Sequence, residues 1–344
     1  MQRRRWLRAE DFERAIAATS LLPGPSSTQL AIYCAWRLRG PAGALVGGAC
    51  FVLPAVLIML PLSAAFLGSA PPAWLRGAGA GAGAAVAAVA LHAGLELSRP
   101  IWVRTPSRRR GRVIGYGLAG AIAAAVTGPW LVLVLLACGG VELLARRGAR
   151  LALVAPPWPL AAAVATGGLG ALAWTAFKVG ALAYGGGFVI VPLMQGDAVD
   201  TYGWMTNAEF VNAVALGQVT PGPVVATIAA VGYAAHGVAG ALLASGVAFA
   251  PSFAFVLLGA DRFERLIASR VAEAFLGGAA PAAVGAIVGS AIPLAAAIGE
   301  PWQVPVLAAA AVLLLLLRRG VVLTLLLAGA TGTVVALAGG PLPT

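Results

Sequence analysis

The chain has 344 residues, of which 60% are apolar and only 10% are charged, and its mean hydropathy is +0.91. A soluble domain of this length needs far more charge on its surface, so the composition excludes a soluble globular protein. The 45 glycines and 23 prolines lie inside apolar runs, where transmembrane helices tolerate them because neighbouring helices satisfy the freed backbone groups. We expect an all-α polytopic protein of the cytoplasmic membrane, surrounded by the lipid bilayer.

The formal net charge of +11 would suggest nucleic-acid binding in a soluble chain. Here the arginines lie in short segments between apolar runs, which is typical of loops on the cytoplasmic side of a membrane. We therefore expect a cytoplasmic N-terminus and no nucleic-acid partner. The three cysteines show no CxxC spacing, and neither a disulfide nor a metal or other cofactor is expected. The arginine segments are residues 3–8, 99–112, 146–150 and 318–319.

The first apolar segment is interrupted by Pro23, Gly24 and Pro25. Arginines lie before residue 10 and again after residue 36, so both ends of this segment are expected on the cytoplasmic side. We therefore predict that residues 10–36 form a re-entrant helical hairpin with the Pro-Gly-Pro sequence at its tip. Non-helical backbone at membrane depth persists only where protein buries it or where it lines a water-filled cavity.

Two full spans are predicted next, over residues 40–67 and 74–96. The sequence GAGAGAG at residues 77–83 predicts a face on which another helix packs closely. His92 and Glu96 suit either a proton relay or the boundary of the second span, and we favour the boundary. The loop that follows, 97–112, holds six arginines and no acidic residue.

Further apolar runs approach the roughly 20 residues that a membrane span needs. Glu142 lies four residues before Arg146, which predicts an ion pair on a helix surface. The remaining predicted spans are residues 113–128, 129–146, 159–176, 240–259, 274–298, 303–318 and 320–339.

Lys178 is the only lysine in the chain, and it precedes Gly185, Gly186 and Gly187 in the apolar segment 177–195. The glycines predict a kinked span or a further hairpin. Lys178 and Gly185 are seven residues apart and share a face if the segment is helical. Lys178 is a candidate counter-charge for an anion; the alternative, slightly favoured, is that its charged end reaches the membrane interface.

The sequence QVTPGPVVAT, residues 218–227, repeats the first interruption. The loop that enters this part of the chain holds Asp197 and Asp200 and no basic residue, so the segment is expected to enter from the opposite side of the membrane. We therefore predict that residues 207–236 form a second hairpin and that His236 lies in a loop at its end.

The two interruptions belong to an internal duplication, which we divide into residues 1–150 and 151–344. The flanking charges of the two copies are opposite, so the copies are expected to lie upside down relative to each other, as in secondary transporters with a substrate site at the repeat interface. A displacement of 198 residues places Trp6 on Trp204, Phe12 on Phe210, Pro23 on Pro221, Gly24 on Gly222 and Pro25 on Pro223.

A helix that begins inside the membrane directs unpaired N–H groups and about half a positive charge at whatever precedes it. Proline suits the first turn of a helix, and glycine permits the turn before it. Two such starts from opposite directions suit an anion. The candidate substrate-binding residues are Pro23, Gly24, Pro25, Ser26, Ser27 and Gln29 at the first interruption, Gln218, Thr220, Pro221, Gly222, Pro223 and Thr227 at the second, and Lys178, Gly185, Gly186 and Gly187 between them.

Alternatives remain at this stage. The Pro-Gly-Pro sequences could be simple kinks, although their repetition favours a function. An intramembrane enzyme is disfavoured because the sequence contains neither HExxH nor GxSxG. A transporter of sulfate or another anion, or a passive anion channel, would use the same broken helices. The oligomeric state is open, with a homodimer among the alternatives.

Trp6, Phe12, the first Pro-Gly-Pro sequence, Gln29 and Pro54 form a pattern that resembles the chromate ion transporter (CHR) family, as does FKVGALAYGGGFVIVPL at residues 177–193 with ALGQVTPGPVV after it. The resemblance covers both halves. It implies two fused domains of opposite orientation and export of chromate, in competition with sulfate, driven by the membrane potential or a proton gradient.

One departure from the family pattern concerns the start of the first copy. The second copy has about 27 residues between Phe177 and Trp204, whereas only five residues precede Trp6. We therefore expect the first broken helix of the family pattern to be missing from this chain.

Overall fold

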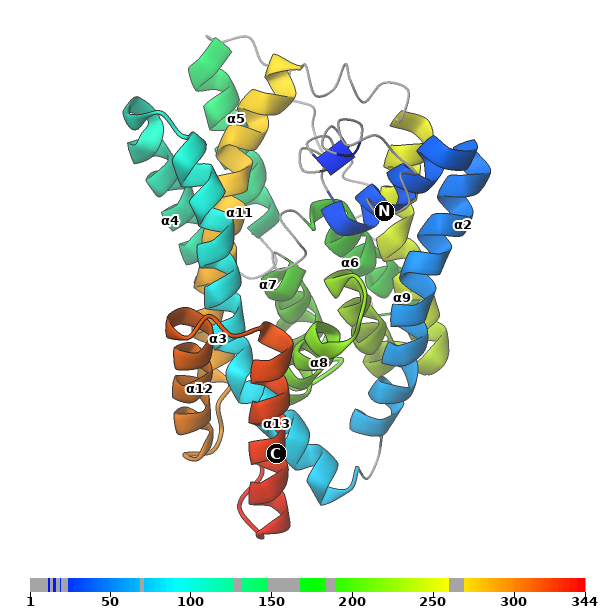
Figure 1. Ribbon diagram of the computed structural model, residues 1–344, viewed down its shortest axis with the longest axis vertical. Helices are drawn as coiled ribbons and strands as arrows, with labels where there is room; N and C mark the ends of the chain where they lie inside the picture. The colour runs from blue at the N-terminus through cyan, green and yellow to red at the C-terminus, as the bar shows by residue number, and fades with distance from the viewer. Residues whose placement is uncertain are drawn as a thin grey trace.

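The computed structural model describes residues 12, 15, 16, 19, 24–68, 71–126, 131–147, 168–183, 190–259 and 269–343. Every regular element in these ranges is a helix, which confirms the all-α prediction (Figure 1). Four helical stretches are long and apolar enough to cross a membrane: Ser26–Phe66, Ala73–Arg104, Val224–Gly259 and Arg270–Ala296. They support the prediction of a multi-pass membrane protein.

The elements follow one another in an order close to the predicted spans. They are α2 (Ser26–Phe66), α3 (Ala73–Arg104), η2 (Ser107–Arg109), α4 (Arg110–Val126), α5 (Leu131–Arg147), α6 (Leu169–Leu182), α7 (Ile190–Gln195), η6 (Gly196–Thr201), α8 (Asn207–Val219), η7 (Val224–Thr227), α9 (Ile228–Gly259), α11 (Arg270–Ala296), α12 (Gln303–Ala311), η9 (Val312–Leu316) and α13 (Val321–Leu337).

The second predicted hairpin has a helix on each side of its Pro-Gly-Pro sequence. A capping box starts α8: Thr206 accepts from the Glu209 amide, and Glu209 accepts from the Thr206 amide. The helix ends at Val219, the chain turns through Gly222 at φ +143°, and η7 and α9 follow directly. Residues 207–236 thus contain two helical arms joined at this turn, and their re-entrant course in the membrane stays a prediction.

Both α2 and α9 contain a kink with the same backbone geometry. In α2, Gly40 has φ 62° and ψ −151°; in α9, Gly237 has φ 60° and ψ −150°. Positive φ at these values is available to glycine at little cost. His236, expected in a loop, has non-helical backbone angles (φ −146°, ψ 32°) and lies with Gly237 in the short break between the two parts of α9.

Helices α2 and α9 lie side by side and run in opposite directions (Figure 1). Ile32 and Ala44 of α2 cluster with Val256 near the end of α9. Gly48 permits this approach, because a Cβ there would lie 2.4 Å from the ring of Phe253.

Helix α3 lies between α13 on one side and α8 on the other, and its glycines make both contacts possible. A Cβ on Gly81 would lie 2.1 Å from the Ala328 oxygen of α13, and a Cβ on Gly79 would lie 2.9 Å from Asn212 of α8. The packing face predicted at residues 77–83 is confirmed.

Helix α3 is longer than predicted and continues to Arg104, so the first half of the expected 97–112 loop is helical. Ile101, Trp102 and Val103 extend the apolar run. The next residue, Thr105, is extended at ψ 119°, because Pro106 follows it and disfavours the helical conformation of the residue before it.

Glu142 joins three helices at the arginine-rich end of the molecule. Its carboxylate accepts from Arg146 at 2.8 Å and from the Tyr116 hydroxyl at 3.1 Å, and it lies 3.5 Å from Arg112. Arg146 also binds Glu273 of α11 at 3.1 Å. The predicted Glu142–Arg146 pair is confirmed, but its surface location was wrong: Glu142 is 2% exposed, because α4 and α11 pack over it.

Candidate anion-binding site

The structure describes most of the candidate residues. Pro23, Gly185, Gly186 and Gly187 lie outside the described residues. The remaining residues form three groups: the start of α2, the turn between α8 and α9, and the α6 segment around Lys178.

The first interruption is buried, and α2 begins directly after it. Gly24 has φ +115°, a conformation that L side chains rarely adopt, and a Cβ there would lie 2.5 Å from the Gln29 amide and 3.3 Å from the Gly180 oxygen of α6. Pro25 accepts the first backbone hydrogen bond of the helix, from Gln29 at 3.0 Å. This is the helix start after Pro-Gly-Pro that the sequence predicted.

The polar side chains of the first turn of α2 divide into two groups. Ser27 is exposed and Ser26 is half-buried, whereas Thr28 and Gln29 are fully buried. Within the described part of the chain, the Thr28 hydroxyl has no hydrogen-bond partner. A buried hydroxyl without a partner costs about 1–3 kcal/mol, so this position favours a polar group that binds there, such as water or an anion.

The second interruption is more open than the first. Pro221 and Gly222 are exposed and Pro223 is buried, and a Cβ on Gly222 would lie 2.6 Å from the Ala55 methyl group of α2. Thr220 and Thr227 use their hydroxyl protons locally, donating to Leu216 and Val224 at 2.8 Å.

Gln218 and Ser252 contribute further polar atoms that lack a partner among the described residues. The Gln218 amide nitrogen and the Ser252 hydroxyl are both buried. Gln218 was a candidate from the sequence. Ser252, in α9, was not among the candidate residues.

Each interruption packs against the other half of the chain. Gly24, in the first half, contacts Gly180 of α6, and Gly222, in the second half, contacts Ala55 of α2. Gly180 in turn lies against α9, where its Cβ would be 1.8 Å from the Ala248 oxygen. The two helix starts are therefore part of the interface between residues 1–150 and 151–344.

Lys178 is paired with a buried carboxylate. Its Nζ atom lies 2.5 Å from Oδ2 of Asp197, and the same oxygen accepts from the Thr175 hydroxyl at 2.7 Å. The side chain of Asp197 is 2% exposed and that of Lys178 is 13% exposed. Lys178 does not lie alone at the membrane interface, and its charge is compensated in this state.

Asp197 was expected in an acidic loop, and this prediction was wrong. It lies in η6, a π-helical segment held by the bond from the Tyr202 amide to the Asp197 oxygen at 2.9 Å. Burial and the Asp197 carboxylate raise the pKa of the Tyr202 phenol, which lies in the connection after η6. Sequence reasoning missed Asp197 and Thr175 because their pairing with Lys178 depends on how α6 and η6 meet.

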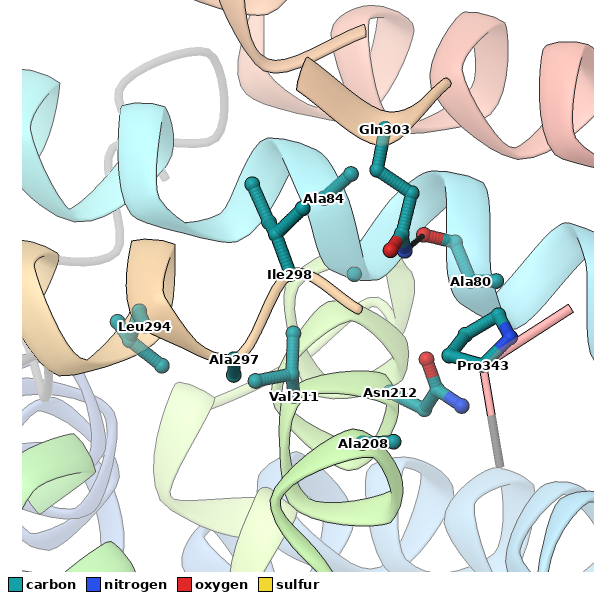
Figure 2. A pocket seen from close by; sticks show the side chains of 11 residues that line it. Ala80, Ala84, Ala208, Val211, Asn212, Leu294, Ala297, Ile298, Gln303 and Pro343 are labelled. Carbon is teal, nitrogen blue, oxygen red and sulfur yellow. Dashed lines mark hydrogen bonds between the residues drawn. The ribbon is translucent and has the colours of Figure 1, made fainter. Parts of the chain in front are cut away.

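Two cavities near this region do not suit an oxyanion. The first, of about 240 Å³, is lined by Gln195, Asn207 and Asp200, whose negative charge repels an anion. The second, between α3, α8 and α12, has a volume of about 10 Å³ and is lined by Asn212 and Gln303 (Figure 2). It has room for about one water molecule.

Comparisons with known proteins show the family of the chain. The sequence model of the chromate transporter family matches residues 1–143 and 170–333. The chain belongs to this family. It is thus a transporter-family protein and not an enzyme.

Named relatives cover most of the chain. It is 30% identical to a chromate transport protein of Cupriavidus metallidurans over 86% of this chain and 75% of the relative. A chromate transport protein of Pseudomonas aeruginosa is 30% identical over 88% of this chain and 75% of its own length. A probable chromate transport protein of Synechococcus elongatus is 29% identical over 86% of this chain and 77% of its own length. No solved structure matches the chain significantly.

Proposed function

We propose that this protein is a secondary active transporter that exports chromate, or a sulfate-like oxyanion, across the cytoplasmic membrane and so confers chromate resistance. The observation that carries the proposal is the pair of Pro-Gly-Pro turns, each followed by a helix start and each packed against the opposite half of the chain. Family membership and the relatives named for chromate transport supply the substrate class.

The two halves form inverted repeats in this proposal. Its support is the antiparallel course of α2 and α9 and their matching kinks at Gly40 and Gly237. In inverted repeats, helix starts from the two copies approach the centre of the membrane from opposite sides. The arginine-rich ends of α3, α5 and α11 would face the cytoplasm, in line with the positive-inside rule.

The anion is bound by backbone N–H groups at the starts of α2 and of η7 with α9, where the helix dipoles favour negative charge. Thr28 and Gln218 add buried polar atoms that lack other partners among the described residues. Lys178 supplies the positive charge. The exposed turn at Pro221 and Gly222 faces a water-filled access path, because non-helical backbone at membrane depth needs protein or water around it.

Transport by purified protein in liposomes tests the proposal. Vesicles that contain the protein should accumulate labelled chromate by counterflow when they are loaded with unlabelled chromate, and external sulfate should compete. A passive channel lets label equilibrate without transient accumulation. A sulfate carrier shows counterflow with sulfate but not with chromate. Absence of flux for every tetrahedral oxyanion would refute the proposed function.

A matched pair of glycine variants tests the first interruption. Gly24→Leu places a side chain at φ +115° against Gln29 and Gly180, so counterflow should fall at least tenfold. In Gly140→Leu the new Cβ meets no atom within 4 Å, and transport should stay within twofold of the unmodified protein. Equal activity of the two variants at equal expression would contradict the assigned site.

A further inference from the structure

We propose that Asp197 is the resting partner of Lys178 and that the transported oxyanion takes the place of its carboxylate. This inference rests on the proposed function, since it concerns how the same site accepts its substrate. Asp197 is then a positioning residue, one that controls when Lys178 offers its charge to an anion.

The location of the pair sets it apart. Among the described residues, the other ion pairs connect arginines with Glu96, Glu142 and Glu273. The Lys178–Asp197 pair instead joins α6 to η6, and α6 also carries Gly180, whose carbonyl oxygen lies against Gly24 at the first interruption. Along α6, Lys178 thus precedes by two residues the glycine that contacts the first interruption.

The hydrogen bonds of the pair allow the lysine to leave without releasing the carboxylate. Oδ2 of Asp197 accepts from both Lys178 and Thr175, at 2.5 and 2.7 Å. Thr175 lies one turn before Lys178 on α6, so it holds the carboxylate in place while the longer lysine side chain turns away. The lysine is also the more accessible partner, at 13% exposed against 2% for Asp197.

The local backbone is unusual at the same point. Asp197 lies in a π-helical segment, a rare conformation that occurs often at functional sites. The Thr201 hydroxyl donates to the Gly196 oxygen at 2.8 Å and supports this turn. The wider turn directs Asp197 toward α6, where it meets Lys178.

For electrostatic reasons Lys178 pairs with only one anion at a time, either the Asp197 carboxylate or the transported oxyanion. While Asp197 is bound, the pair has no net charge, and its carboxylate repels an incoming dianion. A buried ammonium without a partner is costly, so the empty site needs Asp197 as much as the loaded site needs the substrate. Exchange of one anion for the other keeps Lys178 compensated in both states. Among the described residues, the Asp197 carboxylate then has Thr175 alone, and this cost opposes release of the lysine until an anion is present.

Binding of labelled sulfate to the purified full-length protein tests the inference. In Asp197→Asn the lysine has no competing carboxylate, and sulfate should bind at least tenfold more tightly than to the unmodified protein. Lys178→Met should lose sulfate binding. The double variant Lys178→Met, Asp197→Asn should regain thermal stability, because no buried charge is left alone, but should not regain binding. Recovery of binding in the double variant would show a purely structural pair and overturn the inference.

Infrared difference spectroscopy on the unmodified protein gives a measurement that does not depend on how the variants fold. The chain contains four aspartates. With carboxyl-labelled aspartate, sulfate addition should shift a carboxylate band, and this shift should be absent in Asp197→Asn. The inference is overturned if the unmodified protein shows no band shift, or if folded Asp197→Asn binds sulfate with unchanged affinity. If the unmodified protein still transports the anion in that case, the proposed function stands. A protein that binds and transports no oxyanion refutes both.

Discussion

Gly180 offers a direct test of how α6 is positioned. The change Gly180→Ala adds one methyl group, which would lie 1.8 Å from the backbone oxygen of Ala248, against at least 3.4 Å for an ordinary contact. The clash is with backbone, so no side-chain rotation relieves it. Helices α6 and α9 must separate by more than about 1 Å, which should cost about 1–3 kcal/mol, the usual penalty for an overpacked contact.

Gly246→Ala is the matched control on α9. Its Cβ meets no atom within 4 Å, so the control keeps the gain in helix propensity, about 1 kcal/mol, without the clash. Thermal unfolding in detergent should give a lower Tm for Gly180→Ala and an equal or higher Tm for Gly246→Ala. Chromate counterflow should fall severalfold in Gly180→Ala alone, because its α6 is displaced from the first interruption.

The difference between the two variants reports on the contact between Gly180 and Ala248 alone, because both variants share the gain in helix propensity and any effect on expression. If Gly180→Ala matched Gly246→Ala in both Tm and transport, the close crossing of α6 and α9 would not exist in the membrane. The placement of Lys178 beside the first interruption would then be wrong as well.

Three other changes test separate parts of the structure. Gly222→Ala should reduce transport more than Gly203→Ala, because both introduce a side chain at positive φ but only Gly222 also meets a neighbouring helix; equal transport rates would contradict this contact. Glu142→Gln should lower stability by about 3–5 kcal/mol, as for a broken buried ion pair, whereas the exposed Glu96→Gln should change it by less than about 1 kcal/mol; similar thermal shifts would place Glu142 at the surface. Gln303→Ala removes three hydrogen bonds to backbone groups. Denaturant unfolding should therefore show a free energy of unfolding that is lower by roughly 1 kcal/mol or more for each backbone group left unpaired.

The sequence was sufficient where a local pattern determines the backbone. Pro-Gly-Pro repeated in two halves predicted the helix starts at Ser26 and after Pro223, because proline and glycine restrict backbone geometry whatever surrounds them. The alternating glycines of residues 77–83 predicted the packing face of α3 for the same reason.

The sequence was insufficient where function depends on contacts between distant segments. The partner of Lys178 is 19 positions away, in a π-helical turn that no short motif announces. Burial of Glu142 follows from the packing of α4 and α11 over α5, which its i,i+4 spacing to Arg146 does not reveal. In both cases the local sequence placed an acidic residue in a loop or on a helix surface, and the contacts between helices bury it.

The glycine faces of α3 have a mechanical consequence. Where Gly81 meets α13 by backbone alone, no side chains interlock, so the contact resists separation but gives little resistance to sliding along the helix axis. Hydrogen bonds help to fix the axial position: the Thr333 hydroxyl of α13 donates to the Trp74 oxygen of α3 at 3.4 Å. Gln303 also contributes, because its amide donates to the Ala80 oxygen of α3 at 2.8 Å (Figure 2). The Gln303 carbonyl accepts from the amides of Gly299 and Glu300. One glutamine thus ties α3 to the α11–α12 connection, and its loss would remove one of the bonds that hold α3 in register.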